Sequence, residues 1–191
     1  MEACISGGVD VVQLRDKHLD ARGLVQRARA VKEVCAQSDV PFVLNDRPDL
    51  ALDAGADGVH VGQEDATARL ARRILGPLAL VGLSTHAPDE LLASRDEPVD
   101  YVSAGPVVPT PTKAGRPGTG TGYVSYAVSR AGRPVFVTGG VSPETVGDLV
   151  KAGARRFVVV RYLTSSDDPA RDAQRLRSSV GAALERVETS S

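Results

Sequence analysis

Seven short apolar runs, each followed by a polar loop and a helix-like segment, most restrict how this chain can fold. The runs are rich in β-branched residues and nearly continuous, which is typical of parallel strands buried on both faces. Their alternation with helices indicates right-handed β-α-β units, so the sequence predicts an α/β protein. The predicted strands are Val9–Leu14, Pro41–Leu44, Gly58–Val61, Leu80–Leu83, Tyr101–Ala104, Val135–Val137 and Phe157–Val160.

Several of the intervening helices have recognisable ends. Asp20 is expected to cap a helix with one apolar face. Ser142 and Pro143 have the residue types of an N-cap and a first helical position. Amphipathic spacing predicts a last helix over Pro169–Val187.

A weak internal repeat distinguishes a barrel from an open sheet. Gly55 and Gly153 each follow a helix and precede a strand, and Gly7 has the same context. Gly7 should therefore end a helix, yet only six residues precede it, against a mean helix of about 11 residues. We predict a TIM (β/α) barrel with seven of its eight strands, as one N-terminally shortened domain over 1–191.

Composition excludes several classes of partner. A net charge of −1, 4% aromatic residues and no tryptophan argue against nucleic-acid binding. No apolar run reaches the roughly 18 residues of a membrane span. Cys4 and Cys35 lack metal-ligand spacing, so we expect a reduced, cytoplasmic protein. A homo-oligomer is possible, and the sequence leaves the oligomeric state open.

The polar ends of the first three strands carry the strongest chemical signal. Gln13, Arg15 and Lys17 alternate, so an extended chain would place an amide and two cations on one face, where they could hold a diphosphate. A solvated strand end explains them equally well. Asp46 and Asp65 follow neighbouring strands and could share one Mg²⁺ with substrate phosphates, or could each cap the next helix.

The later strand ends add hydroxyls and glycines. Ser84 follows the fourth strand, and the loop after the fifth leads to Thr110, Thr112 and Lys113 and then to 114–122, a lid or a solvent loop. Gly139-Gly140 follows the sixth predicted strand, and the seventh ends at Val160-Arg161; the loops after the last two strands often bind phosphate in barrels. The mid-strand His60 is expected to have a neutral packing or hydrogen-bonding role, not a catalytic one.

In order along the chain, these stretches resemble the thiamine-phosphate synthase family. The likeness runs from about Gly7 to Pro169, and six motifs in the right order are more specific than any one. The matching motifs are Gln13-Leu14-Arg15-Asp16-Lys17, Asn45-Asp46-Arg47, Gly58–Asp65, Ser84-Thr85-His86, Gly105-Pro106 with Thr110–Lys113, and Gly139-Gly140-Val141.

The resemblance implies a transferase that joins 4-amino-5-hydroxymethyl-2-methylpyrimidine diphosphate to a thiazole phosphate and releases pyrophosphate. By resemblance, Asp46 and Asp65 ligate one Mg²⁺, and Gln13 positions the pyrimidine. The residues implied to hold the diphosphate are Arg15, Lys17, Asn45, Ser84 and Lys113, of which Arg15, Lys17 and Lys113 assist its departure. The residues implied to meet the thiazole phosphate are Thr110, Thr112 and Gly140, with Val160 and Arg161 beside it.

Two departures from the family leave alternatives open. The family has a strand and most of a helix before the position of Ser6, and many members have a serine where Arg161 stands. A thiazole tautomerase shares the barrel, but it needs neither a metal nor a diphosphate grip. An inactive remnant that binds a phosphate ligand is the other alternative.

Overall fold

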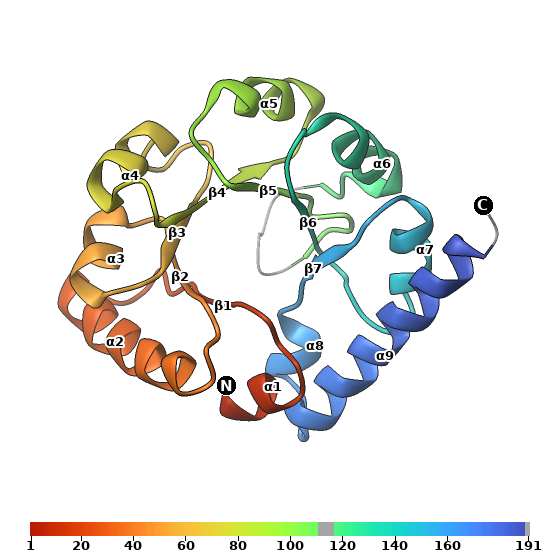
Figure 1. Ribbon diagram of the computed structural model, residues 1–191, viewed down its shortest axis with the longest axis horizontal. Helices are drawn as coiled ribbons and strands as arrows, with labels where there is room; N and C mark the ends of the chain where they lie inside the picture. Colours follow the sequence, from red (N-terminus) through yellow and green to blue (C-terminus); the bar gives the residue numbers. More distant parts are fainter. Residues whose placement is uncertain (111–116, 190–191) are drawn as a thin grey trace.

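The computed structural model describes residues 1–110 and 117–189, in which helices surround one curled parallel sheet (Figure 1). The sheet order is β1-β2-β3-β4-β5-β6-β7, and every neighbouring pair is parallel. Strand order thus follows chain order, as in a (β/α) barrel. The strands are β1 (Val12–Leu14), β2 (Phe42–Asn45), β3 (Gly58–Val61), β4 (Leu80–Thr85), β5 (Tyr101–Ala104), β6 (Val135–Thr138) and β7 (Arg156–Val158).

Helices follow the strands and form the outer layer seen in Figure 1. Asp20 caps α2 by accepting a hydrogen bond from the Gly23 amide, as predicted. The last helix, α9, also matches its predicted span to within one residue. The helices are α1 (Glu2–Ser6), α2 (Ala21–Gln37), α3 (Pro48–Ala54), α4 (Ala68–Leu75), α5 (Pro88–Ala93), the 3-10 helix η1 (Ser94–Asp96), α6 (Gly120–Arg130), α7 (Val146–Lys151), α8 (Arg161–Thr164) and α9 (Pro169–Glu188).

The two edges of the sheet are β1 and β7, which approach each other as the sheet curls (Figure 1). On the outside, α1 packs against α9 near this opening. A side chain at Gly7 would overlap the Ala170 carbonyl oxygen and come within 2.6 Å of Ala173 Cβ. Gly7 therefore allows the end of α1 to lie directly on α9.

Alternation along the strands gives the sheet an apolar outer face and an inner face that carries most of its polar side chains. Phe42, Leu44 and Val59 pack outward into a buried cluster with Leu24 and Ala28 of α2. A second cluster joins β6 and β7 to α6, α7 and α9. The inner face carries polar and small side chains, among them Gln13, Asn45, His60, Gly82, Ser84 and Ser103.

Several predicted boundaries were wrong. The first strand begins at Val12 instead of Val9, and the last ends at Val158 instead of Val160. Ser142 does not cap α7, which begins at Val146. The Thr145 hydroxyl accepts from the Ser142 amide and donates to the Gly140 carbonyl, so these residues form a hydrogen-bonded turn before the helix.

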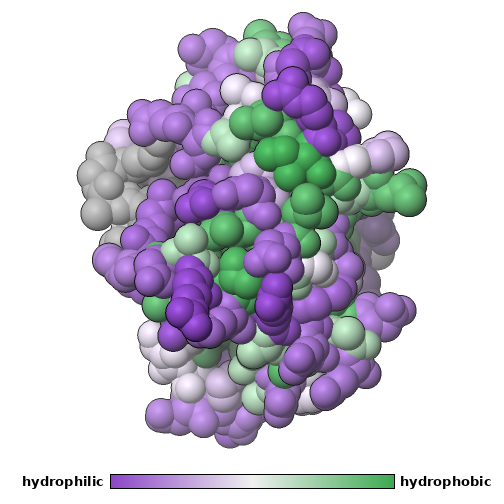
Figure 2. All heavy atoms as spheres, turned by 90° about the vertical axis from the view of Figure 1, so that its left-hand side faces the viewer, coloured by the Kyte–Doolittle hydropathy of each residue, from purple (hydrophilic) through white to green (hydrophobic). Residues whose placement is uncertain are grey.

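The face of the molecule drawn in Figure 2 is mostly polar. Figure 2, which views the left-hand side of Figure 1, shows one area where apolar residues gather among hydrophilic ones. Leu52 and Leu78 are among the exposed large apolar residues, and Leu78 is 96% exposed. None of the helices in the described ranges is both long and apolar enough for a membrane span.

Candidate active site

The loop after β1 projects its polar side chains away from the core. Gln13, Arg15 and Lys17 are all exposed, in alternation with partly buried neighbours, as the sequence predicts. Asp16 orders this loop because its carboxylate accepts from the amides of His18 and Leu19. The hydrogen bond from the His18 backbone amide is the main reason why the pKa of Asp16 is lowered. The two cations therefore stand on an ordered loop.

Asp46 and Asp65 come together at the ends of β2 and β3. Burial, followed by the neighbouring Asp65 carboxylate, raises the pKa of Asp46, while Lys17 opposes the shift. The Nζ of Lys17 lies 3.1 Å from Oδ2 of Asp46. The alternative that both aspartates cap helices is wrong, because Arg47 and Thr67 occupy those positions. Two carboxylates and one cation thus share this corner of the site.

The backbone at Asp46 is unusual. Its φ of +67° lies in the left-handed region, which non-glycine residues visit rarely and at some energetic cost. The Asp46 amide donates to the carbonyl of His60 at 2.8 Å, which fixes this conformation against β3. Asp65 is held by its own loop, since Oδ2 accepts from the Gly62 amide at 2.8 Å. Both carboxylates are therefore positioned by backbone contacts.

Ser84 lies near the end of β4 in a buried polar network. Its hydroxyl oxygen is 2.9 Å from Nε2 of His60, and its carbonyl accepts from the side-chain amide of Gln63. His60 is 6% exposed and contacts the Tyr101 hydroxyl through Nδ1 at 3.1 Å. The predicted hydrogen-bonding role of His60 is confirmed. Sequence analysis did not single out Tyr101, because nothing local to it signals a contact two strands away.

The ends of β6 and β7 carry the predicted phosphate-binding residues. Gly139 and Gly140 have φ values of +94° and +74°, and a side chain on Gly139 would come within 2.7 Å of the Val107 amide nitrogen. Val160 and Arg161 are exposed at the start of α8. These residues, like Asp46, lie at the carboxyl ends of strands. Their strands, β6 and β7, are far from β2 in the order of the sheet.

The loop after β5 is only partly described. Thr110 is partly buried, whereas Thr112 and Lys113 lie outside the described residues. The predicted lid or solvent loop over 114–122 is partly helical, because α6 begins at Gly120. Asn45, at the end of β2, is partly buried beside β3, where it pairs with His60 in register.

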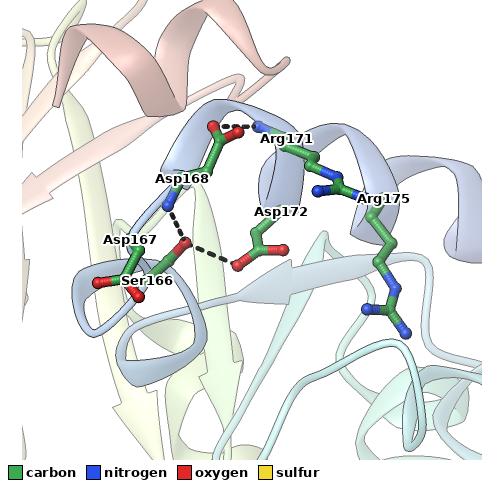
Figure 3. Close-up of a pocket in the computed structure, with 6 residues that line it drawn as sticks. All are labelled: Ser166, Asp167, Asp168, Arg171, Asp172 and Arg175. Atoms are coloured by element: carbon green, nitrogen blue, oxygen red, sulfur yellow. Dashed lines mark hydrogen bonds between the residues drawn. The ribbon is translucent and has the colours of Figure 1, made fainter.

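A surface pocket of about 490 Å³ lies at the connection between α8 and α9, and Figure 3 shows its side chains. Ser166 donates to Asp172 at 2.6 Å, and Asp168 accepts from the Arg171 amide, which caps α9. These polar groups thus stabilise the start of the helix. The lining residues are Ser166, Asp167, Asp168, Arg171, Asp172 and Arg175.

The model of the family described as thiamine monophosphate synthase matches residues 1–163. The chain belongs to the thiamine monophosphate synthase family. This agrees with the resemblance and with the transferase class predicted from the sequence.

Curated relatives and solved structures of the thiamine monophosphate synthase family agree with this membership. Thiamine-phosphate synthase of Thermus thermophilus is 46% identical over 177 residues, which are 92% of this chain and 85% of the relative. The Mycobacterium tuberculosis protein of the same name is 42% identical over 193 residues, which cover 95% of this chain and 87% of the relative.

Thiamine phosphate pyrophosphorylase from Pyrococcus furiosus superposes with a TM-score of 0.87 at 26% identity, over 96% of this chain and 88% of that one. A 3-hexulose-6-phosphate synthase, at 24% identity and a TM-score of 0.69 over 94% and 93% of the chains, shares the fold. The predicted TIM-type α/β fold is thus confirmed.

Proposed function

We propose that this chain synthesises thiamine phosphate from 4-amino-5-hydroxymethyl-2-methylpyrimidine diphosphate and a thiazole phosphate, with release of pyrophosphate. The gathering of Lys17, Asp46 and Asp65 at the carboxyl ends of β1–β3 is the observation that carries this proposal. Barrel enzymes place their chemistry at this end of the sheet. A diphosphate needs cations, and a divalent metal needs carboxylates, so the cluster suits a metal-bound diphosphate.

Asp46 and Asp65 fit a Mg²⁺ site in their chemistry. Mg²⁺ commonly uses one or two carboxylates, completed by water and substrate phosphates. Among the described residues no group of three or more histidine, cysteine or acidic side chains forms a richer metal site. Burial first, and then the neighbouring Asp65 carboxylate, raise the pKa of Asp46, and a divalent cation bound here would offset the repulsion between the two carboxylates. When bound, the metal would neutralise charge on the leaving pyrophosphate.

The protein's own groups would stabilise and orient the reactants. Arg15 and Lys17 would bind the diphosphate from the β1 loop, with Asn45 and Ser84 as hydrogen-bond partners from β2 and β4. Carbon–oxygen cleavage would release pyrophosphate and leave a cation on the pyrimidine's exocyclic carbon, which the thiazole nitrogen captures. This step needs no protein nucleophile, only positioning and charge stabilisation. Gln13 would orient the pyrimidine.

The thiazole phosphate would bind at the carboxyl ends of β5 to β7. These ends form the other half of the barrel mouth, which is the opening at the carboxyl ends of the strands. The backbone at Gly139-Gly140 can approach a ligand closely because neither residue has a side chain. Thr110 and Arg161 would add a hydroxyl and a cation, with Val160 beside them. Thr112 and Lys113 keep the roles that the family resemblance implies, as predictions.

The test is product formation by the purified chain with both substrates, in Mg²⁺ and in excess EDTA. We expect thiamine phosphate and pyrophosphate to form in equal amounts, and only when Mg²⁺ is present. A folded sample that binds substrates but forms no product contradicts the proposal and favours the phosphate-binding remnant. Conversion of a thiazole carboxylate tautomer without metal or pyrimidine would favour the tautomerase. The cytoplasmic location, the single domain over 1–191 and homo-oligomerisation stay predictions.

A further inference from the structure

Three polar side chains on neighbouring strands connect the middle of the inner sheet face to its mouth. Tyr101 Oη lies 3.1 Å from Nδ1 of His60, and Nε2 of His60 lies 2.9 Å from Oγ of Ser84. His60 and Ser84 are 6% and 5% exposed. Polar groups buried to this degree are ordinarily paired with fixed partners. The row therefore joins β3, β4 and β5 through paired, buried polar groups.

The direction of the hydrogen bonds in this row depends on whether Tyr101 donates to His60. Burial raises the pKa of its phenol, so the hydroxyl keeps its proton. Its ring stacks on His60 with centroids 5.5 Å apart and meets Phe136 edge-on at 5.0 Å, which holds the hydroxyl against Nδ1. If Tyr101 donates to Nδ1, the neutral imidazole carries its own proton on Nε2. His60 then donates to Ser84.

Gly82 provides the space for this arrangement. It lies in register with His60 of β3 and with Tyr101 of β5, so it separates the two side chains on the inner face. A Cβ at Gly82 would overlap the Tyr101 ring and hydroxyl and come within 2.5 Å of Nδ1 of His60. The contact between β3 and β5 thus depends on the missing side chain of β4.

The consequence appears at Ser84. Its oxygen would accept from His60 Nε2, and the Ser103 hydroxyl also donates to it at 3.4 Å. A serine hydroxyl has one proton and two acceptor sites. If His60 and Ser103 both donate to this oxygen, the Ser84 hydroxyl would offer its own proton to an acceptor. The oxygens of an ionised diphosphate are acceptors only.

We propose that Tyr101 and His60 form a hydrogen-bond relay that presents the Ser84 hydroxyl as a donor to the substrate's diphosphate. His60 is then a positioning residue, which acts through Ser84 and does not touch the reacting atoms. The role of Ser84 rests on the proposed function, whereas the tautomer of His60 does not. The two are therefore tested separately.

The tautomer is measured without any ligand. The chain has three histidines, so long-range proton–nitrogen correlation spectra of the imidazoles contain three rings, and His60→Gln assigns the one of interest. We expect the Nε2–H tautomer in the wild-type chain and its loss or mixing in Tyr101→Phe. Tyr126→Phe, which alters a tyrosine on α6, is the matched control and should leave the spectrum unchanged. A wild-type Nδ1–H tautomer would overturn the relay.

Binding of Mg²⁺ with inorganic pyrophosphate, measured by calorimetry, tests the link to Ser84. We expect His60→Leu and Ser84→Ala each to weaken binding about tenfold, as for one lost bond to a charged acceptor. The double variant should be no weaker than Ser84→Ala alone. His60→Gln, whose amide can still donate to Ser84, should retain most of the affinity, and it remains informative if His60→Leu does not fold.

The outcomes separate the two proposals. Additive losses in the double variant would mean that His60 acts independently of Ser84 and would overturn the relay. Relay behaviour in both experiments, together with no thiamine phosphate formed, would support the relay and contradict the proposed function.

Discussion

The Nζ of Lys17 and Oδ2 of Asp46 lie 3.1 Å apart, so the loop after β1 is joined to the end of β2 by a salt bridge. The Lys17 side chain is 51% exposed, and ion pairs of this kind stabilise a fold by less than about 1 kcal/mol. Lys17 can therefore exchange the carboxylate for a phosphate oxygen at little cost. The pair is therefore weak enough to be replaced by a contact with the proposed diphosphate.

Removing the Lys17 cation should weaken pyrophosphate binding. We expect Lys17→Gln to raise the dissociation constant of Mg²⁺-pyrophosphate about tenfold, because one charge-assisted hydrogen bond of about 1.5 kcal/mol is lost. Isothermal calorimetry measures this dissociation constant for the wild type and the variant. Lys151→Gln, on the exposed face of α7, is the control. Equal affinities for Lys17→Gln and the control would remove Lys17 from the site.

Substitution of either aspartate should abolish metal-dependent turnover. Asp46→Asn and Asp65→Asn each remove a charged oxygen ligand, and we expect turnover at fixed Mg²⁺ to fall about 100-fold or more. Initial rates across a Mg²⁺ titration measure the effect. Asp53→Asn, at the exposed Arg29 pair on α3, should behave as the wild type. Full activity of Asp46→Asn in EDTA would contradict the metal assignment.

Asp46→Asn should also stabilise the chain in the absence of metal. The pKa of Asp46 is raised above 3.8 in the folded chain, chiefly by burial, so the unfolding free energy falls as pH rises through that raised pKa. Asparagine avoids this loss and is tolerated at a φ of +67°. Thermal melts at neutral pH in EDTA should therefore give a higher midpoint for Asp46→Asn.

Added Mg²⁺ reverses that order. It should raise the midpoint of the wild type and leave that of Asp46→Asn unchanged, since a ligand stabilises only the state that binds it. A lower midpoint for Asp46→Asn in EDTA would mean that the Lys17 salt bridge outweighs the cost of burying the carboxylate.

Amide exchange should differ sharply between the middle and the edges of the sheet. Strand β4 pairs on both sides, whereas β1 and β7 each pair with one neighbour. Because edge amides open with a smaller free energy, we expect β7 to exchange its amides far faster than β4. Hydrogen exchange read by mass spectrometry measures both segments. Equal protection would indicate that another strand covers the edges in solution, as in an oligomer.

The sequence predicted the elements better than their contacts. Each strand is encoded locally by β-branched residues, so β2 to β6 match their predicted runs to within one or two residues. Asp46 and Asp65 were predicted together because parallel strands end at one edge of the sheet. The late start of α7 was missed because Thr145, not Ser142, makes the decisive side-chain contacts.

The relay could not have been read from the chain. Its three members are separated by 24 and 17 residues in sequence and meet only through the register of β3, β4 and β5. Gly82 alone gives no sign that a tyrosine occupies its space. The role of Gly82 is to leave space for its neighbours, so it can be recognised only when the positions of His60 and Tyr101 are known.

The loops after β1 and β7 are linked along two paths around the sheet. In a closed ring, backbone hydrogen bonds would fix the span between the β1 loop and the β7 loop from both directions around the circumference. Here the ladder runs only the long way, through β2 to β6. The short way is bridged by α1 resting on α9 at Gly7. In the described part of the chain, the proposed diphosphate-binding loop after β1 and the proposed thiazole-phosphate residues after β7 are therefore linked over the shorter path by helix packing.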